Sequence, residues 1–299
     1  MRTYAFRIKC KLTGGDFGTN EREFPLALPA LIPPIIVSLP ERGSPTEDQF
    51  LILRGGGFTS EEEARAAGGR VKTAVMLAGV LLGFGIDVGT DQVISPAGHR
   101  KDGQPDEHLQ PDVHGLQVVP EIEGRMLFGF IRVELLVPKT FTESFQKRVA
   151  ETYALNKVLT KQQTLAAQLY NQSHFLSSDA ARFITLISAV EALAERRSRS
   201  HAAVALIERL MQMTVEAGNP DDLNNGLGNL KQESIRSACR RLVTTHCGKP
   251  AATALMRAYT IRGTLLHEGG PPSGTNLAAD LWTLDPLVGH LIVRHVEVN

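Results

Sequence analysis

The sequence is poor in cysteine, and this scarcity excludes two common ways of stabilising a domain. Only three cysteines occur, Cys10, Cys239 and Cys247, and they are widely separated. Three are too few for a disulfide framework or for a four-cysteine zinc site. We therefore expect a reducing, cytoplasmic environment.

The chain also lacks a long hydrophobic run and an excess of charge of one sign. Its longest nearly uninterrupted apolar stretch, Ala74 to Ile86, has 13 residues, whereas a membrane-spanning helix needs about 20. We expect this stretch to be a buried helix, and we expect no signal peptide and no membrane partner. The 32 basic and 32 acidic residues cancel, which excludes polyanion binding through bulk charge but leaves room for a local basic patch.

The 299 residues, 42% of them hydrophobic, are enough for two globular domains. Residues 1–139 are rich in glycine and proline and contain short apolar runs, which predicts an α+β domain. Residues 140–299 show repeated helical periodicity, which predicts an all-α helical bundle. We place the boundary near Pro138, where the strand-like run Leu127–Val137 ends.

Five segments of the N-terminal half have recognisable patterns. Residues 4–12 alternate between apolar and polar side chains, as half-buried strands do, and residues 35–39 and 50–53 are further strand candidates. A capping-box sequence at Ser60–Glu63 predicts a helix that ends near Gly83. Residues 95–116 are predicted to form a long polar loop.

Two groups of residues in this half could carry chemistry. Arg54–Phe58 contains three successive glycines, which suit either a glycine-rich turn between strand and helix or a phosphate cradle at a helix N-terminus. It lacks the spacing of a P-loop or a dinucleotide fingerprint. A second group interleaves histidines with aspartates but fits no metal-ligand spacing, so we expect a solvated loop; it comprises His99, Asp102, Asp106, His108, Asp112 and His114.

In the C-terminal half, apolar residues recur at helical spacing along several segments. A capping box at Thr140–Glu143 opens the first of them, and two further stripes run through 183–193 and 235–243. Gly248-Lys249-Pro250 is a helix stop signal. Asp285-Pro286 is predicted to begin a last helix, with proline at its first position.

The stretch around Arg262 is the most informative part of the sequence. Leu255, Tyr259, Arg262 and Leu266 are separated by four, three and four residues, so they share one helix face that we expect to be buried. A buried arginine is costly unless an anion meets it. A carboxylate such as Glu191 or the phosphate of a ligand would serve.

His267 follows Arg262 by five residues and is expected at the helix C-terminus, because Gly269 is a natural terminator. Cations are stabilised there by the helix dipole. An arginine and a histidine so close together could stabilise charge and move a proton during phosphodiester cleavage. Between Lys231 and Arg262 seven basic residues face one acidic residue, and the candidates for phosphate binding among them are Arg236, Arg240, Arg241 and Arg257.

Three blocks in this order, Phe183–Leu193, Glu233–Val243 and Tyr259-x-x-Arg262-x-x-x-x-His267-x-Gly269, resemble the HEPN superfamily and, within it, the Apea-like branch. The resemblance covers about residues 140–299. It implies an all-α bundle that forms homodimers and an endoribonuclease that needs no metal or cofactor, of the kind found in toxins and phage-defence effectors. Arg262 and His267 would be the catalytic pair, supported by Glu191 and Tyr259, and the 2′-hydroxyl of the RNA would attack the adjacent phosphate.

The sequence leaves other functions open. The residue after the arginine is often polar in active members of the family, and here it is Gly263. This departure favours a non-catalytic HEPN module that binds RNA or a nucleotide, or that acts as a dimerising scaffold. A further alternative is an enzyme whose site lies around Arg54–Phe58. The N-terminal half resembles no family and is expected to sense a trigger, to restrain the nuclease or to bind a partner.

Overall fold

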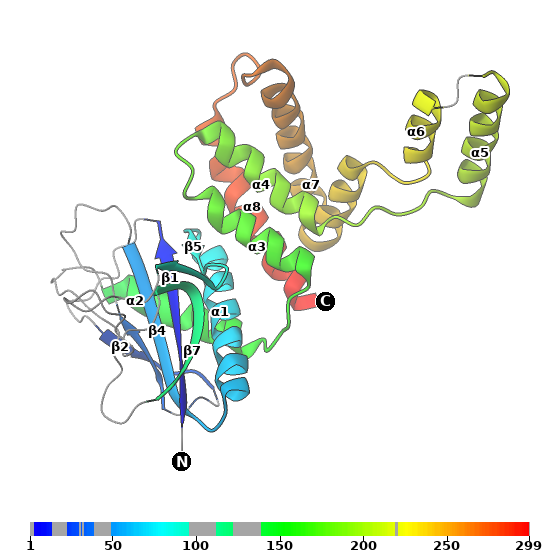
Figure 1. Ribbon diagram of the computed structural model, residues 1–299. Coiled ribbons are helices and arrows are strands. Elements are labelled where there is room, and N and C mark those ends of the chain that lie inside the picture. The colour runs from blue at the N-terminus through cyan, green and yellow to red at the C-terminus, as the bar shows by residue number, and fades with distance from the viewer. Residues whose placement is uncertain are drawn as a thin grey trace. The chain divides into compact units, whose positions relative to one another are not determined.

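A computed structural model of the chain describes residues 3–13, 23–29, 31, 33–38, 49–95, 112–121, 139–218 and 221–298. The chain forms two compact units, Met1–Ser177 with Val296–Asn299, and Ser178–His295. The first unit contains an antiparallel sheet with helices, and the second is helical (Figure 1). The predicted order, an α+β region followed by a helical region, is confirmed at this level.

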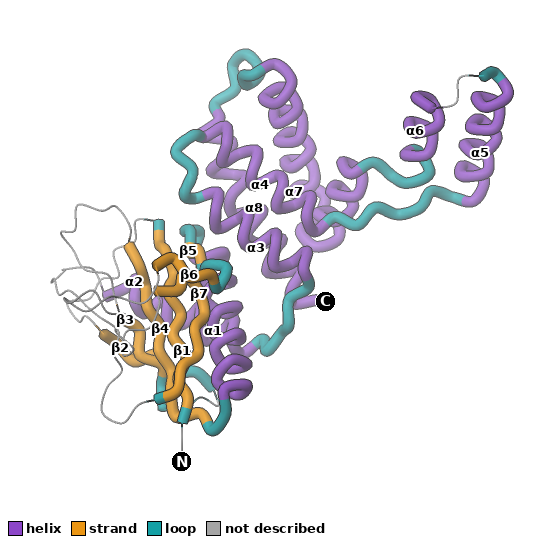
Figure 2. Tube along the Cα trace, in the orientation of Figure 1, coloured by secondary structure: helices purple, strands orange, loops and turns teal. Residues whose placement is uncertain are grey.

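The sheet of the first unit has seven strands among the described residues, and the strand pairings among them are antiparallel. The order is β2-β3-β4-β1-β7-β6, and β5 pairs with β1 (Figure 2). The strands are β1 Tyr4–Leu12, β2 Glu23–Leu26, β3 Ile35–Ser38, β4 Gln49–Phe58, β5 Ile86–Asp87, β6 Gln92–Ser95 and β7 Asp112–Pro120.

Helix α1, Glu61–Leu82, packs against β1, β4 and β7. Phe6 and Ile8 of β1 lie in the core, but Ala5 and Arg7 between and beside them are buried too, so this part of β1 is not half-buried as predicted. Gly68 of α1 lies so close to the Phe6 ring that a Cβ atom there would approach it to 3.1 Å. The predicted ends of this helix are confirmed. The Ser60 side chain accepts a hydrogen bond from the Glu63 N–H, and Gly83 ends the helix with φ 69°.

The structure corrects two predictions in this unit. The glycines of Arg54–Phe58 continue strand β4 and do not form a turn, because β1 pairs with them and the Phe6 ring occupies the space beside Gly55. Residues 112–116, expected in a polar loop, belong to β7, because their backbone pairs with β1 and β6. Ser95, the first residue of that predicted loop, ends β6. Residues 96–111, including His99 and His108, and the run 127–137 lie outside the described residues.

The boundary between the compact units also differs from the predicted one near Pro138. Helices α2, Lys139–Ala154, and α3, Lys161–Ser173, belong to the first unit. Buried hydrogen bonds explain this assignment, because Thr152 donates to the carbonyl of Ala74 and Asn171 donates to the carbonyl of Met76. Both helices therefore complete the core of the sheet unit.

The second unit is built from helices α4 Asp179–Leu193, α5 His201–Glu216, α6 Asp221–Asn229, α7 Ile235–Glu268 and most of α8, Leu277–Val298. The predicted stop at Gly248-Lys249-Pro250 is confirmed as a break within α7. Gly248 has φ 88° and ψ 171°, so α7 consists of two helical segments joined at this residue. Pro250 then stands in the first turn of the second segment, where its missing N–H costs nothing.

The predicted start of the last helix at Asp285-Pro286 is wrong. Helix α8 begins at Leu277, and the side chain of Asn276 accepts a hydrogen bond from the Ala279 N–H. Pro286 lies inside the helix on an exposed position, where the carbonyl it leaves unbonded can reach water. Within the described residues, no helix is long and apolar enough to span a membrane.

Candidate functional site

The candidate site lies where α4 packs against the second segment of α7. The predicted stripe on α4 is confirmed, since Phe183, Leu186, Ile187, Val190 and Leu193 are all buried. Glu191 sits beside this stripe near the end of the helix. Leu255 and Tyr259 of α7 are buried as well. This packing brings Glu191 to the face of α7 that carries Tyr259 and Arg262.

The Glu191 carboxylate divides its two oxygens between two side chains of α7. The Tyr259 hydroxyl donates a hydrogen bond to Glu191 Oε1. Arg262 Nη2 lies 3.6 Å from Glu191 Oε2, close enough for an ion pair but beyond normal hydrogen-bond length. The structure thus brings together three predicted site residues, Glu191, Tyr259 and Arg262, and it supplies the carboxylate that the sequence required.

Burial changes the proton affinity of two groups in this cluster. Burial raises the pKa of the Tyr259 hydroxyl, and the hydrogen bond to Glu191 adds to the increase. Burial also raises the pKa of the Cys239 thiol, to about 12, although Tyr259 opposes the shift. The Cys239 sulfur lies 4.0 Å from the Tyr259 oxygen. Both groups are therefore neutral near pH 7 and act as hydrogen-bonding groups, not as nucleophiles.

The Arg262 guanidinium has only part of its hydrogen-bonding capacity satisfied. Its Nε atom is buried and has no hydrogen-bond partner in the described part of the chain, while 27% of its side chain remains exposed. The prediction that Leu266 continues the buried face is wrong, because Leu266 is 47% exposed. The buried part of this face therefore ends before Leu266, and Arg262, with 27% of its side chain exposed, lies at the solvent-accessible edge of the packed interface.

His267 is exposed and lies in the last turn of α7, which ends at Glu268 with Gly269 in the left-handed conformation at φ 75°. The predicted helix end is confirmed. Five residues along a helix correspond to a rise of about 7.5 Å and a rotation of about 140°. Arg262 faces Glu191, so within one chain His267 emerges on a different side of α7.

The four predicted phosphate-binding arginines differ in their surroundings. Arg236 and Arg240 are exposed, and Arg236 lies within 3.4 Å of the Thr260 hydroxyl. Arg241 is already hydrogen-bonded within the protein. Its Nη2 donates to Glu233 Oε1 at 2.5 Å and to the Glu195 carbonyl at 2.6 Å. The hydrogen bond from Arg241 lowers the pKa of Glu233.

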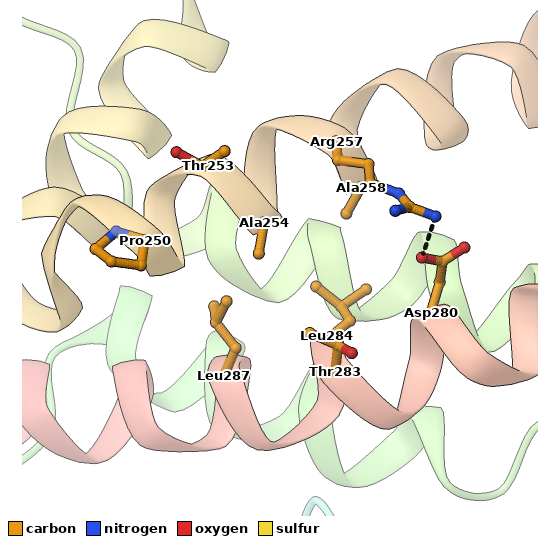
Figure 3. Close-up of a pocket in the computed structure, with 9 residues that line it drawn as sticks. All are labelled: Pro250, Thr253, Ala254, Arg257, Ala258, Asp280, Thr283, Leu284 and Leu287. Carbon is orange, nitrogen blue, oxygen red and sulfur yellow. Dashed lines mark ion pairs between the residues drawn. The ribbon is translucent and has the colours of Figure 1, made fainter.

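Arg257 borders a groove of about 340 Å³ between α7 and α8 (Figure 3). The groove exists because small side chains on α7, Ala254 and Ala258, face Leu284 of α8. Asp280 pairs with Arg257 across one end at 3.1 Å, and the Arg257 side chain is 71% exposed. Nothing in the sequence pattern singled out Asp280, because it lies on a separate helix. The groove can hold an apolar group beside a guanidinium.

The glycine-rich segment does not offer a free phosphate cradle. The Gly57 N–H donates to the Glu121 carboxylate at 3.1 Å. Where the chain is described, no group of three histidine, cysteine or acidic side chains is placed to hold a metal ion. His114 instead lies 3.2 Å from the carbonyl of Asp87.

Searches of family models, curated proteins and solved structures give no match for this chain.

Proposed function

We propose that the chain is a metal-independent endoribonuclease of the HEPN type, in which Arg262 and His267 act on the RNA backbone. A cytoplasmic toxin or phage-defence effector is the biological role that fits such an activity. The observation that carries the proposal is the state of Arg262. It lies at the open end of the α4–α7 interface, beside a carboxylate that does not form a hydrogen bond with it, and five residues before an exposed histidine.

The chemistry requires a proton carrier and a charge stabiliser. The 2′-hydroxyl of one nucleotide attacks its own 3′-phosphate, and the bond to the 5′-oxygen of the next nucleotide breaks. His267 would assist transfer of the proton from the attacking hydroxyl toward the leaving oxygen. Arg262 would stabilise the negative charge on the non-bridging oxygens. The products are a 2′,3′-cyclic phosphate and a 5′-hydroxyl end.

A homodimer through the second unit would complete this site. In one chain, Arg262 and His267 emerge on sides of α7 about 140° apart, which makes it difficult for both to reach one phosphate. A second copy can place its own His267 near Arg262 of the first. The exposed apolar side chain of Leu266, near this helix end, supplies surface for such contact.

The direct test is to incubate the purified chain with single-stranded RNA in the presence of EDTA and to analyse the product ends. We expect cleavage that survives the chelator and leaves 2′,3′-cyclic phosphates. Products with 3′-hydroxyl ends, or cleavage abolished by the chelator, would contradict the proposal.

A non-catalytic module that binds RNA or nucleotides, or a dimerising scaffold, is the second candidate. Two observations favour it: among the described residues no hydrogen bond or ion pair orients the His267 ring, and Gly263 adds no polar group next to Arg262. RNA that is bound but never cut, with affinity unchanged by His267→Ala, would support this candidate over the nuclease.

A further inference from the structure

Tyr259 and Arg262 share a single carboxylate. They lie three residues apart on α7 and both face Glu191 of α4. The tyrosine hydroxyl takes Oε1 by a hydrogen bond, whereas the arginine stays 3.6 Å from Oε2. A guanidinium and a carboxylate left to themselves prefer two parallel hydrogen bonds, which would use Nε and one Nη of the arginine. That arrangement is absent here, because Arg262 Nε has no partner among the described residues.

The surroundings of Tyr259 keep its hydroxyl on Glu191. Only 9% of Tyr259 is exposed, so solvent cannot readily satisfy the hydroxyl. The hydroxyl also lies 4.0 Å from the Cys239 sulfur, which is a weak hydrogen-bond partner. Loss of the bond to Glu191 would leave a nearly buried polar group unpaired, which is unfavourable.

From this geometry we infer that Tyr259 is a positioning residue that prevents Glu191 from closing on Arg262. The guanidinium is thereby kept free to bind a phosphate group with N–H donors that a paired hydrogen bond to Glu191 would otherwise use. The inference rests on the proposed function for the identity of that phosphate, an RNA phosphodiester. The positioning of Glu191 by Tyr259 is argued from the contacts of these three side chains and does not depend on that function.

The decisive variant is Tyr259→Phe, which removes the hydroxyl and keeps the ring. Released from the tyrosine, Glu191 is expected to form a paired hydrogen bond with Arg262. The Arg262 Nε–H signal, assigned in ¹⁵N NMR spectra by its loss in Arg262→Lys, should then move and exchange more slowly with solvent. Affinity for inorganic phosphate, followed by the same signal, should fall about tenfold, the effect of losing one charge-assisted hydrogen bond.

The double variant Tyr259→Phe/Glu191→Gln separates positioning from packing. A neutral amide cannot neutralise Arg262, so the double variant should regain the phosphate affinity of the parent. A purely structural tyrosine would give no such rescue. Cys239→Ala serves as the matched control, since it removes the weaker contact to Tyr259 and should leave the Arg262 signal in place.

The outcomes distinguish this inference from the nuclease proposal. An Arg262 Nε–H signal unchanged by Tyr259→Phe, or phosphate affinity not restored in the double variant, overturns the inference whatever the RNA assay gives. If the signal and phosphate affinity behave as expected but the parent neither binds nor cuts RNA, the positioning role stands and the RNA function fails.

Discussion

At the scale of single residues, Glu191 connects the two helices of the candidate site. Its position beside the apolar stripe of α4 and the placement of Arg262 on a packed face were both readable from residue spacing. The hydrogen bond from Tyr259 was not, because helical periodicity tells which residues share a face but not which polar atoms meet across an interface. In the positioning role that we infer for Tyr259, this hydrogen bond sets the 3.6 Å separation of Glu191 from Arg262.

Replacement of Glu191 should therefore affect stability as well as function. Glu191→Ala leaves the Tyr259 hydroxyl without an acceptor and Arg262 without its carboxylate. The side chains of the ion pair are partly exposed, 22% for Glu191 and 27% for Arg262. We therefore expect a loss of about 1–3 kcal/mol in the free energy of unfolding. Urea denaturation measures this loss. A variant as stable as the parent would show that the cluster contributes nothing to folding.

A pH dependence of stability is expected from His295. Burial lowers its pKa below the usual 6.5, and nearby His246, whose ring centroid lies 5.4 Å away, lowers it further, while Glu195 acts in the opposite direction. Between the folded-state pKa and 6.5 the unfolded chain binds the proton more readily than the folded chain. Above pH 6.5 the titration of His295 therefore does not reduce the free energy of unfolding. As the pH falls from 6.5 toward the folded-state pKa, the free energy of unfolding decreases.

His295→Gln should accordingly make the decrease in melting temperature below pH 6.5 shallower. His290→Gln, at an exposed position of the same helix, is the matched control and should leave the decrease unchanged. An identical pH profile for the parent and His295→Gln would refute this assignment.

At the scale of helices and strands, counting charges along the sequence overestimated the basic character of the site. The segment from Lys231 to Arg262 contains seven basic residues and one acidic residue. In the structure, carboxylates from other helices pair with several of them: Glu208 with Lys231, Asp280 with Arg257 and Glu191 with Arg262. A local count cannot include carboxylates that the fold brings from elsewhere.

Replacing a glycine of α7 by alanine is expected to change stability in opposite directions at Gly263 and at Gly248. A Cβ atom at Gly263 would meet nothing within 4 Å, so Gly263→Ala should stabilise the chain by about 0.5–1 kcal/mol through helix propensity. Gly248 has φ 88° and ψ 171°, a conformation open almost only to glycine. Gly248→Ala should destabilise by about 1–3 kcal/mol. Thermal unfolding checks both signs, and a common sign would contradict the kink in α7.

The start of α8 shows where local signals fail. Proline after an aspartate is a common helix start, and the sequence alone favours Asp285-Pro286 for that reason. The helix begins earlier because Asn276 caps it and because Leu281, Leu284 and Val288 bury a continuous apolar face. Tertiary packing outweighs the cost of one internal proline on the exposed side.

At the scale of the whole molecule, the order of a sheet unit and a helical unit was predictable, but the boundary between them was not. Both α2 and α3 have the periodicity of bundle helices, and periodicity does not reveal against which element a helix packs. The hydrogen bonds of Thr152 and Asn171 to α1 decide the question. The described strands β2, β5 and β6 are short, with two to four residues, which is too few for a reliable alternation.

The proposed nuclease requires a second copy of the chain. Light scattering at micromolar concentration should therefore give about twice the monomer mass of 32.6 kDa. Leu266→Lys places a charge on the exposed apolar surface near the proposed contact and should shift the mass toward the monomer. A parent that remains monomeric at these concentrations would contradict a site completed by two subunits.

The most direct test of the central claim is single-turnover cleavage of RNA by the parent, His267→Ala and His290→Ala. Removal of a general acid–base group should slow cleavage by about 10²–10⁴-fold in His267→Ala with little change in RNA affinity. His290→Ala, which alters an exposed histidine outside the site, should cleave at the parental rate. Equal rates for all three proteins, or no cleavage by the parent, would contradict the assignment of the active site to Arg262 and His267.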